Sequence, residues 1–519
     1  MILNIIGQIH EQERVIIINI ALENEIKPQN RVLFKTLLKP FIPRNLITEE
    51  LNGIYSQSLL EEMAEIIQYY NIYENGMDFP VNSSKDYVPS TLLFKKISSL
   101  LSKEARFMFA KSPDFTILPL DPKEKEKADI YQKYINEILK VNHVKGNLIK
   151  AAKDCFIGKR IAIICNFNIE YGITITFVPS LEFIYDTDEF GRLNKIVCFY
   201  NTNTESNRDL QRINKKKYWI ENNICHVSEG IYNGNGELIE EIIKDEKTLF
   251  NYIPAVVILN DGLTGDMLGQ SEVKQLAQYE EYYSKLANSD IDSERNTMNP
   301  IKYTIDIASD STDNLPISPG AFWDLKSDPA ADSSGTVGSI ESSLSYSNAL
   351  SETLERIKNT MYETLDMPAV TSADLQGIVT SGKTLKAIYW SLIVRCDEKF
   401  LAWKYELEKI VKCLIDGAFL YPEIAKKYTA DKLPDLEYTI DIVNQYPLPE
   451  DEQEEKTIDL SEVAAQTMSK KSYMMKWRGL TADEADEELK QLAIERQTLE
   501  ESYYPADNPK ETEDMLDMP

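Results

Sequence analysis

Apolar residues recur every three to four positions along much of the chain, which is the spacing of helices that bury one face. This spacing predicts helices over 47–74, 91–110, 125–156, 268–295, about 340–365, 383–416 and, as a final pair, about 456–500. Proline or glycine bounds several of them, since Pro89 and Pro113 flank the second helix and Gly417 follows the longest one. The first 155 residues are therefore expected to be mostly helical.

Two of these helices have a well-defined apolar face. In the helix over 268–295 the predicted buried face carries Val273, Leu276, Tyr279, Tyr283 and Leu286. The helix over 383–416 places its apolar residues on one face from Leu385 to Leu414, and at about 1.5 Å per residue it would span roughly 50 Å.

Strand patterns fill the middle of the chain. β-Branched and aromatic runs at 160–169, 172–186, 194–201 and 216–232 are separated by turn residues, so we expect an antiparallel sheet from about 160 to 258. The segment 300–325 has the pattern of a strand, an acidic turn and a second strand, and 328–339 that of a flexible connector. A further strand is expected at 436–442. The predicted fold class is α+β.

The charge balance limits how this chain can handle nucleic acid. Of its 519 residues, 84 are acidic and 56 are lysine or arginine, a net charge of −28. Wrapping of duplex DNA needs a surplus of basic residues on the contact face, so that mode is excluded. A channel whose wall repels the polymer and lets it slide remains compatible with this charge.

Cysteine and histidine usage predicts neither a metal site nor a cofactor. The six cysteines form no C-x-x-C pair, and with three histidines no zinc-ligand spacing arises (Cys155, Cys165, Cys198, Cys225, Cys396, Cys413). Acidic clusters lack EF-hand spacing. The apolar N-terminus is interrupted by His10, Glu11, Glu13 and Arg14 before it reaches membrane-spanning length, and it lacks a basic leader, so synthesis in the cytoplasm is expected.

Residues 377–384, GIVTSGKT, fit the phosphate-binding pattern G-x-x-x-x-G-K-[ST]. A P-loop needs a buried strand directly before it, but the preceding DMPAVTSADLQ contains a proline, two aspartates and no β-branched run. The glycines instead favour a loop between two helices, with Thr380 or Ser381 capping the second. A P-loop NTPase stays as the alternative, and nucleotide binding would separate the two.

Several segments together resemble tailed-phage portal proteins. Residues 252–292 resemble the passage from the sheet into the first stem helix, and 365–399 resemble the tunnel loop and the long helix after it. Residues 468–497 resemble the C-terminal signature, and 156–168 with 181–201 resemble the wing sheet. The likeness runs over roughly 85–500 in the family's order. Lys383 departs from the pattern, because a small apolar residue is more usual there.

The resemblance implies a portal fold and a structural, non-enzymatic function. Portal proteins form rings of about twelve copies at one capsid vertex, and terminase drives double-stranded DNA through the bore. Partners would be terminase, the major capsid and scaffolding proteins and the head-completion adaptor, without a membrane. The protein would belong to the virion. A gene-transfer agent or a defective prophage particle is an alternative source.

Carried onto this sequence, the family's organisation gives the following divisions. The wing would cover 1–265, the stem helices 266–298 and 339–366, and the clip 299–338. The tunnel loop would cover 367–382, the long tunnel helix and return strand 383–449, the crown 450–500 and an acidic flexible tail 501–519.

Candidate site residues follow from these divisions. The residues at the channel surface would be mostly small or polar, so that few aromatic rings could stack on DNA and hold it. These candidates are Ser372, Gln376, Gly377, Thr380, Ser381, Gly382, Lys383 and Lys386. Lys383 and Lys386 either touch the phosphate backbone or pair with acids such as Asp374.

The clip and the stem carry further candidates. The clip residues Asp310, Asp313, Phe322 and Trp323 either dock a partner or, for the two aromatics, bury between subunits. The stem tyrosines Tyr279, Tyr282 and Tyr283 are expected to pack between subunits.

Overall fold

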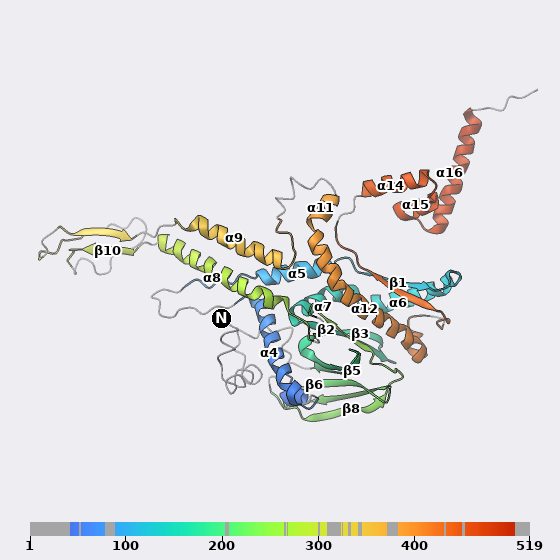
Figure 1. Ribbon diagram of the computed structural model, residues 1–519, viewed down its shortest axis with the longest axis horizontal. Coiled ribbons are helices and arrows are strands. Elements are labelled where there is room, and N and C mark those ends of the chain that lie inside the picture. Colours follow the sequence, from blue (N-terminus) through green and yellow to red (C-terminus); the bar gives the residue numbers. More distant parts are fainter. Residues whose placement is uncertain are drawn as a thin grey trace, which may run out of the picture. The chain divides into compact units, whose positions relative to one another are not determined.

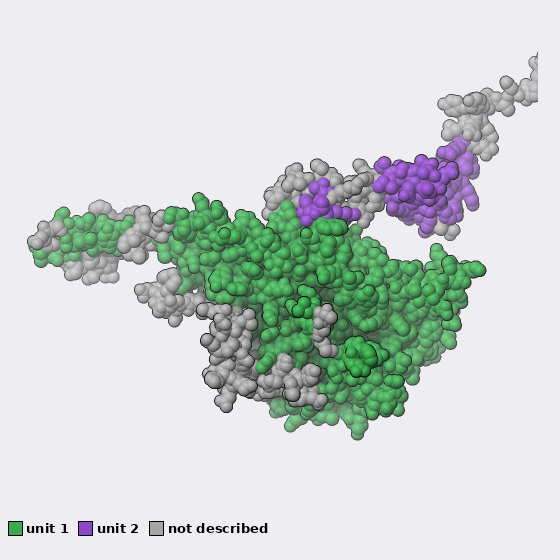
Figure 2. All heavy atoms as spheres, viewed as in Figure 1, with its two compact units in different colours: residues 1–370, 389–447 green, residues 371–388, 448–519 purple. Residues whose placement is uncertain are grey.

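The computed structural model describes residues 42–50, 53–77, 89–202, 207–263, 266, 268–298, 301–308, 323, 325–330, 334–340, 345–370, 382–429, 432–448 and 452–503 (Figure 1). These residues belong to two compact units (Figure 2). The first draws on residues 1–370 and 389–447, and the second on 371–388 and 448–519. Helices and sheets both contribute, which confirms the α+β class.

The first unit begins with helices α3 (Arg44–Thr48), α4 (Gly53–Asn75), α5 (Lys96–Phe109), α6 (Lys125–Val141) and α7 (Val144–Gly158). The single helix expected over 125–156 is wrong, because the chain breaks between α6 and α7. His143 has a φ of 50° in the left-handed region. The Asn142 side chain donates to the carbonyls of Ile138 and Ile173, which ties the break to the neighbouring sheet.

Two antiparallel sheets replace the single sheet expected over 160–258. The smaller has the order β3 (Gly172–Pro179), β2 (Arg160–Asn168), β9 (Ala255–Leu259). The larger has the order β4 (Phe183–Thr187), β5 (Leu193–Asn201), β6 (Ile213–Glu221), β7 (Ile224–Tyr232), β8 (Leu238–Lys247). The first six residues of β2 are all buried, so this strand lies in the core.

A third pairing joins distant parts of the chain. β1 (Asp114–Pro119) pairs antiparallel with β12 (Tyr438–Val443), which lies where a strand was expected. The sequence pattern missed β1, because it lies between two helices in a region expected to be helical. The pairing fixes α6 and the segment after the longest helix on one small sheet.

The longest helix, α12 (Trp390–Leu420), packs against β9, β2 and β12, and the short α13 (Pro422–Ala425) follows it. The single helix expected over 383–416 is wrong, because it breaks at Tyr389 between α11 (Gly382–Ile388) and α12. Of its predicted apolar face from Leu385 to Leu414, the part from Leu392 on is buried as expected, whereas Leu385 and Ile388 are half-buried. Trp403 meets the Phe109 ring edge-on with ring centroids 5.1 Å apart. Gly417 does not end the helix. A Cβ there would come 2.1 Å from Phe167 Cε1, so glycine permits this close approach.

Helices α8 (Glu272–Met298) and α9 (Ser347–Thr364) lie side by side and run in opposite directions (Figure 1). Between them in the chain, β10 (Ile301–Ile305) pairs with β11 (Thr336–Ile340). The strand over 336–340 was expected to be part of a flexible connector, and that expectation is wrong. A single antiparallel β-bridge between Ile307 and Ser327 lies just beyond the end of β10.

The second unit contains α11 (Gly382–Ile388), α14 (Glu452–Ala464), α15 (Lys470–Arg478) and α16 (Ala482–Tyr503). The helical pair expected over 456–500 is therefore three helices. Ser469 caps α15 by accepting from the Ser472 N–H at 3.0 Å, and Gly479, with a φ of 66°, ends it. Asp459 accepts a hydrogen bond from the Trp477 indole at 2.7 Å and joins α14 to α15.

Candidate functional site

Helix α8 buries a row of polar side chains. Glu272, Glu280, Ser284, Asn288 and Asp292 are all less than a tenth exposed. They recur at multiples of four residues, so the row winds slowly around the helix, which has 3.6 residues per turn. A buried polar group is costly unless it is hydrogen-bonded, and most members of this row bind another part of the chain.

Glu280 binds the beginning of α5. Its two carboxylate oxygens accept the backbone N–H groups of Lys96 and Ile97, each at 3.1 Å. Burial raises the pKa of Glu280, and the two backbone hydrogen bonds oppose that rise. The carboxylate satisfies N–H groups that have no partner within the helix, so it fixes the beginning of α5 against the middle of α8.

Asn288 and Asp292 hold the segment that leads into α5. Asn288 accepts from the Leu92 N–H at 2.7 Å and donates to the Leu92 carbonyl at 2.8 Å, in the manner of a paired strand. Asp292 accepts from the Ser90 N–H at 2.9 Å. Side chains from the C-terminal half of α8 thereby bind the backbone of residues 90–92 and attach the helix to the rest of the first unit.

A buried group of charges joins α12 to α5 and α8. Arg395 of α12 donates to Glu104 of α5 at 2.9 Å and to Glu272 of α8 at 3.2 Å. Lys399, one turn further on, binds the same two glutamates, at 2.8 Å for Glu104. Arg395 also lies 3.6 Å from Asp366, directly after α9. Burial alone would lower the pKa of Arg395, but the carboxylates of Glu104 and Asp366 raise it.

The sequence pattern did not identify this charged group or the polar row of α8. The expected face of α8 was wrong in part, because Tyr279, Tyr283 and Leu286 are only half-buried. The recurrence of polar residues at 280, 284, 288 and 292 was a usable signal, since a face that is only solvated does not need amide and carboxylate groups at a fixed four-residue spacing.

The expected channel residues are only partly described. Ser372, Gln376, Gly377, Thr380 and Ser381 lie outside the described residues. Gly382 is the first residue of α11, and Lys383 follows it in the same helix. Lys386 is exposed. Residues 371–376, directly before the motif, also lie outside the described residues, so the argument against a P-loop stays a prediction.

Of the expected clip residues, Asp310, Asp313 and Phe322 lie outside the described residues. Trp323 is half-buried, and the Lys302 ammonium lies 4.4 Å from its ring centroid. That contact attaches Trp323 to β10, by a cation–π interaction of about 0.5–1 kcal/mol at an exposed site.

The stem tyrosines differ in exposure. Tyr282 is 54% exposed, whereas Tyr279 and Tyr283 are half-buried. Tyr283 packs edge-on against Phe94, with ring centroids 5.3 Å apart, and lies beneath the Lys96 ammonium. Tyr283 therefore contributes to contacts within the chain, and Tyr282 presents the most open ring of the three.

Helix α12 also carries an exposed apolar row on the face opposite its core. Trp390, Val394, Leu401 and Tyr405 are between 48% and 63% exposed. At 100° per residue they lie within an arc of about 60°. Isolated exposed apolar residues are common, but a row of four large ones along one helix is typical of an interaction surface.

Residues 54–502 match the model of a family described as "Phage portal protein, SPP1 Gp6-like". This chain belongs to the SPP1 Gp6-like phage portal proteins. It is thus a portal protein, a component of the phage virion. The resemblance noted from the sequence is confirmed, and the match extends over most of the described residues.

Two further comparisons complete the picture. No curated protein sequence matches the chain. Among solved structures, a chain from the "Virion of native gene transfer agent (GTA) particle" is 9% identical, with a TM-score of 0.36; the similarity covers 77% of this chain and 97% of that one.

No metal or membrane feature is found in the part of the chain that the structure describes. Its His, Cys, Asp and Glu side chains form no group of three that could hold a metal ion. Its helices include none that is both long and apolar enough to cross a membrane.

Proposed function

We propose that this portal protein assembles into a closed ring of about twelve copies at one capsid vertex and conducts double-stranded DNA through its bore. Terminase drives DNA inward through the ring, and DNA later leaves toward the tail by the same route. The major capsid and scaffolding proteins hold the ring in the shell, and a head-completion adaptor replaces terminase. Membership of the portal family carries this proposal.

The arrangement of α8 and α9 supports the proposed stem and clip. Two antiparallel helices joined through a small strand pair make a narrow stalk, which is a suitable shape for close neighbours around an axis. We assign 266–298 and 339–366 to the stem and 299–338 to the clip that meets terminase and the adaptor. Residues 1–265 form the wing, 450–500 the crown and 501–519 the tail.

The exposed row of α12 supports self-association. Complete burial of a large apolar side chain contributes about 1.5–3 kcal/mol, so four such residues provide a substantial part of a subunit contact. Such a contribution is needed, because each copy carries a net charge of −28 and the copies repel one another at long range. Salt at physiological concentration screens that repulsion beyond about 8 Å.

The channel surface is assigned to the loop at 367–382 and the beginning of the helix after it. Few aromatic and few basic residues occur in this loop, which suits a surface past which duplex DNA must slide. Lys383 and Lys386 are the exceptions, and we propose that they touch the phosphate backbone transiently. The net negative charge of the chain opposes tight binding elsewhere along the bore.

A particle-forming system that lacks only this protein tests the proposal. Particles assembled without the chain should contain no DNA, and supplying the chain should restore DNA-filled particles. DNA filling of similar efficiency with and without the chain would contradict the proposed function. The matched control is the chain with Lys244→Ser, a substitution at an exposed residue of β8, which should restore DNA-filled particles as the wild-type chain does.

A further inference from the structure

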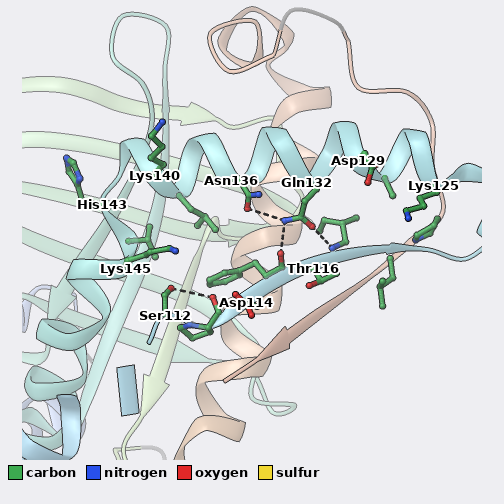
Figure 3. Close-up of a pocket in the computed structure, with 18 of the residues that line it drawn as sticks. Ser112, Asp114, Thr116, Lys125, Asp129, Gln132, Asn136, Lys140, His143 and Lys145 are labelled. Atoms are coloured by element: carbon green, nitrogen blue, oxygen red, sulfur yellow. Dashed lines mark hydrogen bonds between the residues drawn. The ribbon is translucent and has the colours of Figure 1, made fainter. Parts of the chain in front are cut away.

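A groove with a volume of about 1380 Å³ lies between β1 and α6, on the side of β1 away from β12 (Figure 3). Its lining combines apolar residues, among them Phe115, Ile117 and Leu139, with amide and charged side chains. Small-molecule pockets usually measure about 300–1,000 Å³ and enclose most of the ligand. The size and open form of this groove instead suit a segment of polypeptide.

The groove already contains one side chain that imitates a neighbouring strand. Gln132 of α6 donates to the Phe115 carbonyl at 2.6 Å and accepts from the Ile117 N–H at 2.9 Å. Gln132 also donates to Asn136 Oδ1 at 3.1 Å (Figure 3). Asn136 is exposed, and its amide N–H groups have no acceptor among the described residues. They are available to the carbonyl groups of an extended chain.

The rim of the groove is basic in an otherwise acidic protein. Three exposed lysines lie along it, namely Lys125, Lys140 and Lys145. The exposed carboxylates of its lining are those of Asp114 and Asp129. The surrounding stretch 123–153 has eight lysines and four acidic residues, a net charge of +4 in a chain of −28. An acidic segment with apolar side chains is therefore the complementary occupant. Duplex DNA, which is held through phosphates on open basic faces, would leave the apolar floor uncovered.

Residues 1–41 lie outside the described part of the chain, and their first 26 residues have this complementary composition. They contain four glutamates and one arginine, and their isoleucines include the run VIIINI at 15–20. Water contact is unfavourable for so many large apolar side chains. β-Branched residues also favour extended backbone, whose carbonyl groups the Asn136 amide is placed to bind.

We propose that residues 1–26 of the same chain dock in the groove between β1 and α6. The exposed row of α12 is another apolar surface of the described residues, but Asp397 and Glu398 lie beside it and would repel an acidic segment. Residues 27–41 provide the connection to Ile42. Fifteen residues span at most about 50 Å when extended, so residues 1–26 can reach a groove that lies up to that distance from Ile42.

Photo-cross-linking of the full-length chain tests this assignment. A benzoylphenylalanine replaces Ile17, and the cross-linked peptides are mapped by mass spectrometry. We expect cross-links to 112–119 and 125–146 in a product that has the mass of one chain. Cross-links to α12, or none above background, would overturn the proposal. A product with the mass of two chains would overturn the assignment to the same chain.

Charge reversal around the groove supplies the second arm. Lys125→Glu, Lys140→Glu and Lys145→Glu combined should lower the cross-link yield at least fivefold. The matched control reverses three exposed lysines elsewhere, Lys244, Lys247 and Lys274, and should leave the yield unchanged. Circular dichroism confirms that both variants fold. If the groove triple variant weakens duplex DNA binding while the cross-link persists, the groove binds DNA and the proposal fails.

Discussion

Arg395 of α12 donates its Nε–H to a carboxylate oxygen of Glu104 at 2.9 Å, where Glu104 is completely buried. Together with Lys399 it balances the charges of Glu104 and Glu272, so four ionised groups share one buried site that joins α5, α8 and α12. Asp366, where the chain leaves α9 for the proposed tunnel loop, is attached to the same guanidinium. The site therefore attaches two segments to the core: the end of α9, before the proposed tunnel loop, and the first turns of α12, after it.

Arg395→Leu should destabilise the protein strongly. It leaves two buried carboxylates with only the Lys399 ammonium, and removal of one member of a buried charge pair costs about 3–5 kcal/mol. Urea unfolding followed by circular dichroism measures the loss. Arg356→Leu, at an exposed position of α9, is the matched control and should change the free energy of unfolding by less than about 0.5 kcal/mol. Equal effects of the two variants would show that the buried charges are not held together as described.

Asp154→Asn should make stability less dependent on pH. Burial raises the pKa of Asp154 to about 6 from 3.8, and the Tyr70 hydroxyl donates to its carboxylate at 3.0 Å. Because the folded state resists ionisation, the contribution of Asp154 to stability is fully present below pH 4 and is lost as the pH rises through 6. Asparagine keeps the oxygen that Tyr70 binds but does not titrate.

The free energy of unfolding of both proteins at pH 4, 6 and 8 provides the measurement. The Asp154→Asn variant should gain stability relative to wild type as the pH rises, with most of the change before pH 8. A difference between the two proteins that stays constant over this range would refute the role given to Asp154.

Substitution of the exposed row of α12 should prevent assembly without unfolding the chain. Trp390→Ser with Leu401→Ser removes two large apolar side chains from the proposed subunit contact, each of which contributes about 1.5–3 kcal/mol when buried. Sedimentation velocity should then find mainly single chains. Ile169→Ser with Tyr171→Ser alters two residues that are even more exposed, in the turn between β2 and β3, and should leave assembly intact. Normal assembly of the α12 variant would exclude this row from the contact.

Reversal of Lys383 and Lys386 to glutamate should slow or stall DNA packaging and leave assembly unaffected. Both residues lie in α11 directly after the proposed tunnel loop, and each reversal replaces an attraction to phosphate with a repulsion. A DNA-protection assay on filled particles measures packaging. Lys412→Glu, an exposed position near the end of α12, is the control. Unchanged packaging by the double variant would refute a contact role for these lysines.

Sequence periodicity predicted the elements whose stability depends on apolar burial. The core face of α12 and the antiparallel strands over 160–258 were found because every second or every third to fourth residue is apolar. The same reasoning failed at His143, where a left-handed residue interrupts an apolar pattern that continues through the break. It failed again at β11, because the short TVGSI segment follows a run of small residues typical of a connector, and nothing local identifies β10 as its partner.

The charged site could not be predicted from periodicity. Glu104, Glu272 and Arg395 are far apart in sequence and each is typical of a solvated helix face, so only the packing of α5, α8 and α12 reveals that they meet. The pairing of β1 with β12 is hidden for the same reason, since nothing local to either strand identifies its partner. The family resemblance, in contrast, depended on the order of segments, and it needed no contact between them.

Electron microscopy of the purified full-length protein tests the central claim most directly. The account predicts ring-shaped particles with an open central pore, and the variant with Trp390→Ser and Leu401→Ser should lose them. Particles without a pore, or single chains at every concentration and salt tested, would contradict the account.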